Sequence, residues 1–358
     1  MLSWQPSNLA RVVPSTRYQG SKRRILPWIY EHIRHLKCES VLDGFGGTAS
    51  VAYLFKLMGK RVTYNDNLLS NYQTGLALIE NDHVKLTDLD LSFLLRRHEF
   101  VYPSFVQHTF KGIYYTDTEN VWLDRTVHNI RMLVHLYRGD TLRKKRALAY
   151  HALFQACLCK RPFNLFHRRN LYLRETSTKR TFGNKTTWDT GFPPLFKRYS
   201  QEASNKVFPN GQRNRAICMP IMNIDGGNFD LVYLDPPYAR PGEDNPIDYY
   251  SLYHFLEGIV DYENWPSRID WSTVNRRLLR QKSQRESSRQ EFFKNLFEEF
   301  QNSTIVVSYG HPGNPSISTI RQLLGQFKSK VSVRRKEYAY ALNRRNGEGM
   351  QEVLIIGT

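Results

Sequence analysis

Hydrophobic positions in the first 66 residues of the chain follow two different periods. Residues 25–36 carry apolar side chains at helical spacing, which predicts a helix with one buried face. Residues 40–43 and 61–66 are short runs that each contain two apolar residues and end in an acid, and we interpret both as strands. A glycine turn and a helix-like segment over residues 49–58 lie between them. This order forms a βαβ unit, which predicts a parallel sheet with a right-handed crossover.

The strand pattern returns in the last third of the chain. Residues 231–234 and 304–309 are buried-strand candidates, and residues 331–342 alternate between apolar and polar positions. A polar turn over residues 343–349 separates this segment from the apolar run 353–356, which predicts an antiparallel hairpin. We therefore expect an α/β fold with a Rossmann-like sheet that is mostly parallel and ends in an antiparallel hairpin.

The sheet pattern is interrupted in the middle of the chain. Residues 76–216 contain several helix-like segments and then a basic, aromatic and loop-rich stretch. Because the next predicted strand begins only at residue 231, we interpret residues 76–216 as an inserted helical, basic domain. Residues 1–75 and 217–358 then form the sheet domain.

The charge balance favours a polyanionic partner. The 358 residues include 51 Lys and Arg against 33 Asp and Glu, which gives a formal charge of +18 and a pI near 9.7. Such an excess favours nucleic acid, although a solvated basic surface has the same composition. The basic segment 268–290 is expected to be a helix, which either grips a nucleic-acid backbone or is simply solvated.

Composition also excludes several classes of protein. The four cysteines lack the pattern of a disulfide framework or a zinc site, so we expect a reduced, cytoplasmic setting and no bound metal. The longest apolar runs are shorter than the roughly 18 residues of a membrane helix. The N-terminus lacks the basic region and apolar stretch of a secretory signal. We therefore expect no association with membranes.

A rigid corner follows the strand candidate at residues 231–234. Asp235, Pro236, Pro237 and Tyr238 come next in the chain. The two prolines offer no backbone N–H to a sheet and end the strand abruptly. The corner presents one carboxylate, backbone carbonyls and one aromatic ring, which suits a planar, polar ligand.

A glycine turn follows the first strand, at the place where α/β proteins bind nucleotides. The run Asp43-Gly44-Phe45-Gly46-Gly47-Thr48 lacks the glycine spacing of a dinucleotide site and the Lys-Ser/Thr of a phosphate loop. It therefore argues against NAD and ATP as ligands. Asp66 ends the next strand, where it either holds ribose hydroxyls or caps the helix that begins near Leu68.

Four motifs in this order resemble those of the Dam-type, alpha-arrangement DNA adenine methyltransferases. They are Tyr-x-Gly-x-Lys at residues 18–22, the glycine turn, the strand-end Asp66 and the Asp-Pro-Pro-Tyr corner. The resemblance implies a methyltransferase sheet that binds S-adenosylmethionine, with an inserted target-recognition domain over residues 76–216. It also implies site-specific methyl transfer to N6 of adenine in double-stranded DNA, in a restriction–modification or DNA-protection system. It implies the catalytic residues Asp235, Pro236, Pro237 and Tyr238, and the cofactor-binding residues Tyr18, Lys22, Asp43, Phe45, Gly46, Gly47, Thr48, Asp66 and Asp235.

The chemistry of the corner fits that reaction. The N6 amino group of adenine is a poor nucleophile because its lone pair is delocalised into the ring. Asp235 and the Pro236 carbonyl can accept its two hydrogens and so aim the lone pair at the methyl group. Tyr238 can stack on the base, a contact worth roughly 1–3 kcal/mol. Because N6 is paired inside a duplex, the base must first be flipped out, at a cost of a few kcal/mol.

Two positions depart from the family pattern. Tyr18 stands where many relatives carry Trp, which preserves an aromatic surface. Relatives usually place an acid after the short strand that precedes the catalytic one, whereas residues 216–220 contain none. Asp225 is expected to be a turn residue, so the contact to the cofactor's adenine has no candidate. Lys22 is expected to offset the cofactor's carboxylate.

The expected DNA surface lies in the basic part of the inserted block. Basic side chains suit phosphates, and arginine, asparagine and histidine can read base edges. The aromatic residues Phe163, Phe166, Tyr172 and Trp188 either stack against DNA or form the core of the domain. The candidate DNA-binding residues are Lys160, Arg161, Asn164, His167, Arg168, Arg169, Arg174, Lys179, Arg180 and Lys185.

Two other functions stay open at this point. Enzymes that modify guanine in ribosomal RNA carry a similar Asp-Pro-Pro-Tyr or Asp-Pro-Pro-Phe motif, but the long insertion disfavours an RNA base methyltransferase. A DNA-binding protein on an inactive methyltransferase scaffold is disfavoured by the intact motifs. The resemblance leaves room for a cognate restriction endonuclease that acts separately, and we expect a monomer or a weak dimer.

Overall fold

The computed structural model describes residues 4–175, 185–239, 242–243, 245–279, 288–337 and 350–358. Within these residues the centre of the fold is a seven-stranded sheet with the order β3-β2-β1-β4-β5-β7-β6. Neighbouring strands from β3 to β5 pair in parallel, whereas β7 is antiparallel to both β5 and β6. This confirms the expected α/β fold and its terminal hairpin. The strands are β1 (Ser40–Asp43), β2 (Arg61–Asn65), β3 (Arg215–Ile217), β4 (Leu231–Leu234), β5 (Thr304–His311), β6 (Val331–Glu337) and β7 (Gln351–Gly357).

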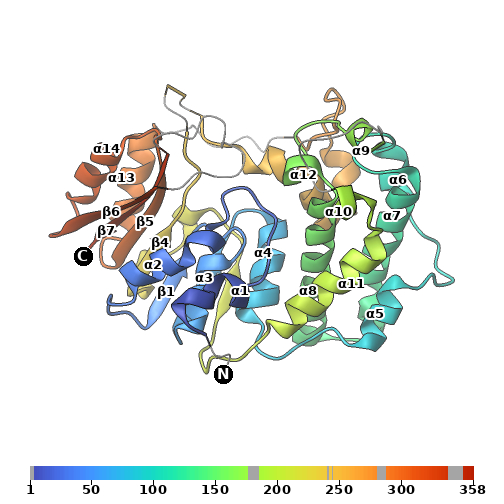
Figure 1. Ribbon diagram of the computed structural model, residues 1–358, viewed down its shortest axis with the longest axis horizontal. Helices are drawn as coiled ribbons and strands as arrows, with labels where there is room; N and C mark the ends of the chain where they lie inside the picture. Colours follow the sequence, from blue (N-terminus) through green and yellow to red (C-terminus); the bar gives the residue numbers. More distant parts are fainter. Residues whose placement is uncertain (1–3, 176–184, 240–241, 244, 280–287, 338–349) are drawn as a thin grey trace.

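Successive side chains of each central strand enter two different apolar layers. In β4, Tyr233 belongs to one hydrophobic cluster, and its neighbour Val232 belongs to the other. In Figure 1 the helices of the second layer stand beside β5 and β7 at the left. Because helices cover both faces, the central strands are buried on both sides, which explains their continuous apolar runs. The first layer contains α2 (Leu26–Ile33) and α3 (Ser50–Leu57), and the second contains α13 (Arg289–Glu299) and α14 (Ile317–Leu324).

Helices make up most of the chain between β2 and β3. In Figure 1 they stand to the right of the sheet, and α8 packs along α11. The apolar core of these helices is continuous with one layer of the sheet. Helix α12 (Tyr249–Val260), which follows the Asp-Pro-Pro-Tyr corner, contributes Phe255 to the same core. The helices between β2 and β3 are α4 (Leu69–Gly75), α5 (Asp88–Leu95), α6 (Phe105–Thr109), α7 (Asp117–Met132), α8 (Gly139–Cys159), α9 (Tyr172–Glu175), α10 (Lys185–Asp189) and α11 (Phe192–Asn205).

The prediction of one helix over residues 268–290 is wrong. A short 3-10 turn ends at Arg268, a loop follows it, and α13 begins only at Arg289. Asp270 provides a physical reason, because its carboxylate accepts the backbone N–H of Ser272 over 3.0 Å. A local bond of this kind competes with helical hydrogen bonding. Residues 280–287 of the segment lie outside the described part of the chain.

The described residues contain neither a membrane-spanning helix nor a cluster of metal ligands. None of the helices there combines the length and the apolar character that crossing a bilayer requires. The same residues hold no group of three or more His, Cys, Asp or Glu side chains placed to bind a metal ion. The four cysteines are free thiols, three of them buried.

Candidate active site

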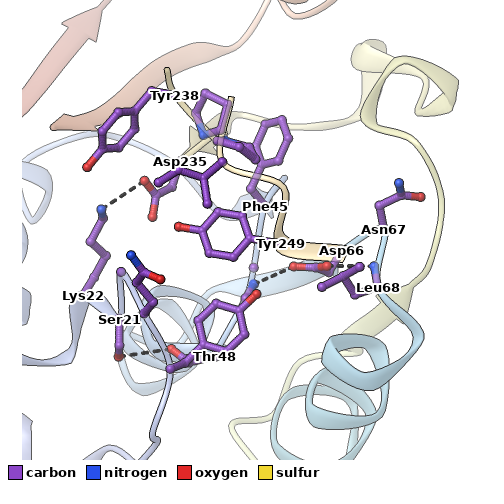
Figure 2. A pocket seen from close by; sticks show the side chains of 18 of the residues that line it. Ser21, Lys22, Phe45, Thr48, Asp66, Asn67, Leu68, Asp235, Tyr238 and Tyr249 are labelled. Carbon is purple, nitrogen blue, oxygen red and sulfur yellow. Dashed lines mark hydrogen bonds and ion pairs between the residues drawn. The ribbon is translucent and has the colours of Figure 1, made fainter. Parts of the chain in front are cut away.

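A pocket of about 600 Å³ opens at the carboxyl ends of β1, β2 and β4. The strand order reverses between β1 and β4, and open α/β sheets bind their ligands at such a switch point. Segments that are far apart in the sequence line the pocket, and Figure 2 shows their side chains converging on it. The described lining residues come from residues 18–22, 43–51, 66–68, 233–238 and 245–250.

The glycine turn after β1 is fixed by its neighbours. A Cβ atom on Gly46 would lie 2.0 Å from the ring of Tyr64, so only glycine fits at this position. Gly47 has a φ of 49°, and its N–H donates to the Oδ2 atom of Asp66 over 2.8 Å. The turn is therefore held against the end of β2, and Thr48 after it also lines the pocket.

Asp66 lies in the pocket wall and uses both carboxylate oxygens. Besides the N–H of Gly47, it accepts the N–H of Leu68 over 2.9 Å. It does not cap α4, because the first N–H groups of that helix donate to Glu257 instead. Each carboxylate oxygen has a second lone pair, so a ligand hydroxyl can still bind to Asp66.

Asp43 ends β1 and is almost completely buried. Its Oδ2 atom accepts the N–H of Ala52 over 2.9 Å, which ties the start of α3 to the pocket. Burial, and after it the nearby charge of Asp235, raises the pKa of Asp43 to about 8. Near neutral pH this side chain is therefore mostly protonated, and its hydroxyl can donate a hydrogen bond.

The corner after β4 holds its carboxylate in an ion pair. The Oδ1 atom of Asp235 lies 3.0 Å from the Nζ atom of Lys22 (Figure 2). Burial raises the pKa of Asp235 to about 6, against the lowering effect of the Lys22 charge. Near neutral pH the side chain is therefore mainly a carboxylate. The carbonyl of Pro237 accepts a hydrogen bond of 2.5 Å from Arg289, which anchors the corner to α13.

Lys22 has two carboxylate partners. Its Nζ atom lies 3.0 Å from Asp235 and 3.0 Å from the Oε1 atom of Glu352, and 5% of its side chain is exposed. The family resemblance assigns Lys22 to the cofactor's carboxylate, whereas in the structure it bridges two acids of the protein itself. No motif marks Glu352 in the sequence. The available signal is an acid directly before the apolar run 353–356 of the last strand.

Tyrosine rings from two elements stack along one wall of the pocket. The ring of Tyr18 is nearly parallel to that of Tyr253, with centroids 4.2 Å apart, and to that of Tyr249 at 5.7 Å. Figure 2 shows Tyr249 among the side chains that line the pocket. The sequence pattern begins this helix near Tyr253. Asp248 caps it by accepting the N–H of Ser251, so α12 begins at Tyr249, and this pocket residue is missed from sequence alone.

Tyr238 packs against β5. The centroid of its ring lies 5.1 Å from that of Tyr309. A Cβ atom on Gly310 would come within 2.2 Å of the Tyr238 hydroxyl oxygen. The missing side chain at Gly310 therefore allows the aromatic ring to lie beside the Asp-Pro-Pro corner.

Three of the candidate DNA-binding cations face inward. Lys160 is buried with its Nζ atom 2.9 Å from Glu119, and Arg174 holds the same carboxylate through bonds of 2.9 and 2.7 Å. Arg161 is also buried and donates to backbone carbonyls of its own loop. These cations stabilise the helical part of the chain. Their expected role at DNA is therefore corrected to an internal one, because burial keeps their charges away from the surface.

The remaining DNA-binding candidates differ in exposure. Arg168 and Arg169 face solvent, and Asn164 and His167 are half-buried. Lys179 and Arg180 lie outside the described residues, as does the side chain of Lys185, the first residue of α10.

The aromatic residues of this basic stretch also divide into two groups. Phe166 and Trp188 are buried and belong to the interior. Phe163 is 49% exposed and Tyr172 is 60% exposed. The backbone of Phe163 has a φ of 60°, the left-handed region that L side chains rarely adopt. Burial therefore assigns Phe166 and Trp188 to the core, whereas stacking of Phe163 and Tyr172 against DNA stays a prediction.

Asp225 is a turn residue, as expected. Its Oδ1 atom accepts the N–H of Gly227 over 2.9 Å. Asn67, which directly follows Asp66 in the chain, also lines the pocket with a polar side chain. No acid from residues 216–220 reaches the cavity, since the segment contains none.

Fold and site together define a class of protein. The sheet is mostly parallel and ends in an antiparallel hairpin, and the pocket brings the glycine turn and the Asp-Pro-Pro-Tyr corner together. This combination defines a Rossmann-like methyltransferase. The sequence model of the D12 class N6 adenine-specific DNA methyltransferases matches residues 18–309, and the chain belongs to that family. It is therefore an adenine-specific DNA methyltransferase. This confirms the leading interpretation of the motifs over the RNA-modifying and inactive-scaffold alternatives.

The chain is also similar to a known methyltransferase over nearly its whole length. The Type II methyltransferase M2.HphI of Haemophilus parahaemolyticus is 25% identical over 352 residues. The aligned part covers 96% of this chain and 97% of that protein. The similarity therefore extends past residue 309 into the C-terminal part of the chain.

Replacing Gly310 by Ala tests the placement of Tyr238. The added methyl group should displace the ring, lower the rate of methyl transfer about tenfold or more, and reduce the free energy of unfolding by about 1–3 kcal/mol. Gly325→Ala is the matched control, because its Cβ would meet its nearest neighbour at 3.4 Å, an ordinary contact. Single-turnover kinetics and thermal melting measure both effects. A normal rate in Gly310→Ala would mean that the position of the ring is unimportant.

Proposed function

We propose that this enzyme transfers a methyl group from S-adenosylmethionine to N6 of an adenine flipped out of double-stranded DNA. The observation that supports this most is that one pocket contains both the glycine turn after β1 and Asp235 after β4. A donor seated on the turn and a base held at the corner then meet inside the same cavity. Its volume of about 600 Å³ falls within the roughly 300–1,000 Å³ of typical small-molecule sites.

The charges of the pocket suit a cationic cofactor. Among the described lining residues, the acids besides the mostly neutral Asp43 are Asp66, Asp235 and Asp248, and the one lysine or arginine is Lys22, which already has carboxylate partners. Such a pocket repels a polyanion like ATP and attracts the sulfonium and amino groups of S-adenosylmethionine. When bound, this cofactor supplies an electrophilic methyl group. The residues that we assign to hold it are Tyr18, Lys22, Asp43, Phe45, Gly46, Gly47, Thr48, Asp66 and Asp235.

The corner after β4 is assigned to the target base. The carboxylate of Asp235 accepts one N6 hydrogen, and the carbonyl of Pro236 accepts the other, so the nitrogen lone pair points toward the methyl group. Pro237 fixes the corner through its bond from Arg289. Tyr238 stacks on the base. No metal or covalent intermediate is needed, because orientation of the two reactants provides the catalysis.

The DNA duplex is assigned to the helical part of the chain. We propose that residues 76–216 form the target-recognition domain and that residues 1–75 and 217–358 form the catalytic domain. Arg168 and Arg169 are exposed cations among the described candidates, and the exposed Phe163 ring lies shortly before them in the chain. Arginines suit phosphates and base edges, and an exposed ring suits stacking on an unpaired base.

We further propose a role in restriction and modification. The similar protein M2.HphI is a Type II methyltransferase by name. Methylation by this chain would then protect a recognition sequence from a cognate endonuclease, which acts as a separate protein.

Asp235→Asn tests the assignment of the carboxylate. The amide removes the negative acceptor, so the rate of methyl transfer in a single turnover should fall on the order of a hundredfold or more. In the wild-type enzyme, kcat/KM should decrease as the pH falls through about 6, because protonated Asp235 no longer accepts the N6 hydrogen. Transfer of a radiolabelled methyl group to DNA measures both. Asp225→Asn, a change in the remote turn, should keep the normal rate and profile.

An undiminished rate in Asp235→Asn, or an acidic limb at the ordinary aspartate pKa near 4, would contradict this assignment.

Salt dependence tests the DNA surface. The logarithm of DNA affinity falls linearly with the logarithm of salt concentration. The slope of this line should become less negative by about 0.9 for each phosphate contact removed. We expect such a change in Arg168→Ala and in Arg169→Ala. Arg34→Ala serves as control, because Arg34 is an exposed cation at the C-cap of α2 and does not line the pocket. Equal slopes in all variants would place the DNA elsewhere.

A further inference from the structure

Glu352 is a fully buried acid in the last strand. It lies beyond residues 18–309, the range that the family model matches. Its Oε1 atom is 3.0 Å from the Nζ atom of Lys22 and accepts a hydrogen bond of 2.8 Å from the Ser308 hydroxyl. Ser308 belongs to β5 and Glu352 to β7, so the carboxylate is fixed between two paired strands.

The same ammonium group connects Glu352 to the corner after β4. Lys22 Nζ lies 3.0 Å from Asp235 Oδ1, and the three side chains are 0% (Glu352), 5% (Lys22) and 21% (Asp235) exposed. An ammonium group has three N–H donors and no acceptor. A buried cation between two carboxylates therefore has little freedom to move, and the direction of the Asp235 carboxylate depends on where Glu352 holds the lysine.

Strand pairing links the three charged side chains to the aromatic ring of Tyr238. Glu352 is the register partner of Gly310, whose missing side chain leaves room for Tyr238. The pairing of β5 with β7 therefore governs the position of both the carboxylate and the ring. Neither β5 nor β7 contributes a described residue to the pocket lining itself.

We propose that Glu352 is a positioning residue for methyl transfer. It fixes Lys22, and through Lys22 it orients the carboxylate of Asp235 so that an oxygen faces the N6 hydrogen of the target adenine. The inference rests on the proposed role of Asp235 as the acceptor. Glu352 itself contacts neither substrate nor cofactor.

The charge of Glu352 also acts on Asp235. The Lys22 cation lowers the pKa of Asp235, and the Glu352 carboxylate raises it. Removing the negative charge of Glu352 should therefore lower the pKa of Asp235 below its value of about 6. The charged or titratable groups that interact with Asp235 are Lys22 from the N-terminal segment, Asp43 from β1, Tyr233 from β4, Tyr238 from the corner, Tyr249 from α12 and Glu352 from β7.

Glu352→Gln tests the proposal, because it keeps the size of the side chain and removes its charge. We expect a fall of about tenfold or more in the single-turnover rate measured at saturating S-adenosylmethionine. The acidic limb of the kcat/KM profile should move to lower pH than in the wild-type enzyme. Asp90→Asn is the control, since Asp90 is a buried acid paired with Lys145 in the helical part. It removes a comparable ion pair and should leave the acidic limb in place.

Glu352→Asp provides a second test that does not depend on the glutamine variant being folded. It keeps the negative charge but shortens the side chain, so it cannot reach Lys22 and Ser308 together. The rate should fall while the acidic limb stays near its wild-type position. A normal rate in both variants, or an unmoved limb in Glu352→Gln, would overturn the proposal. If Asp235→Asn is fully active, the proposed function fails first; if only the Glu352 variants behave normally, this inference alone fails.

Discussion

A single buried ammonium group joins the segments on which the active site depends. Lys22 comes from the N-terminal loop, Asp235 from the end of β4, and Glu352 from the last strand. Burying a cation is unfavourable unless it is paired, and removing one partner of a buried pair is strongly destabilising. The charge is therefore compensated only when all three segments are folded together. The corner that we assign to catalysis is held by the complete sheet, including the antiparallel strands that follow the parallel part.

Two neighbouring acids of the pocket have different charge states. Asp43 has a pKa of about 8 and is mostly neutral, whereas Asp235 has a pKa of about 6 and is mostly ionised near neutral pH. The difference arises because Asp235 has the cation of Lys22 beside it, while Asp43 receives one backbone N–H from Ala52. A neutral donor and a charged acceptor thus lie in one cavity. Asp235 can accept hydrogens from a base while the pocket remains attractive to a positively charged methyl donor.

Features set by neighbours in the sequence could be predicted, and those set by distant partners could not. The strands, the glycine turn and the Asp-Pro-Pro-Tyr corner follow from local periodicity and from proline and glycine stereochemistry. The contact between Lys22 and Glu352 joins the two ends of the sequence, so no local pattern reveals it. Lys160 and Arg168 look alike in a basic run, but only Lys160 meets the carboxylate of Glu119 and becomes buried. Residues 269–279 have a helix-like composition, but they form a loop in which local bonding to Asp270 competes with helical hydrogen bonding.

The central claim is that Asp235 presents the N6 nitrogen of a target adenine to a methyl donor bound at the glycine turn. Plasmid DNA incubated with the enzyme and S-adenosylmethionine, followed by base-resolved sequencing of modified adenines, tests this claim most directly. The account predicts N6-methyladenine at one recurring sequence with the wild-type enzyme and at none with Asp235→Ala. Absence of N6-methyladenine with the wild-type enzyme, or the same methylation with Asp235→Ala, would contradict it.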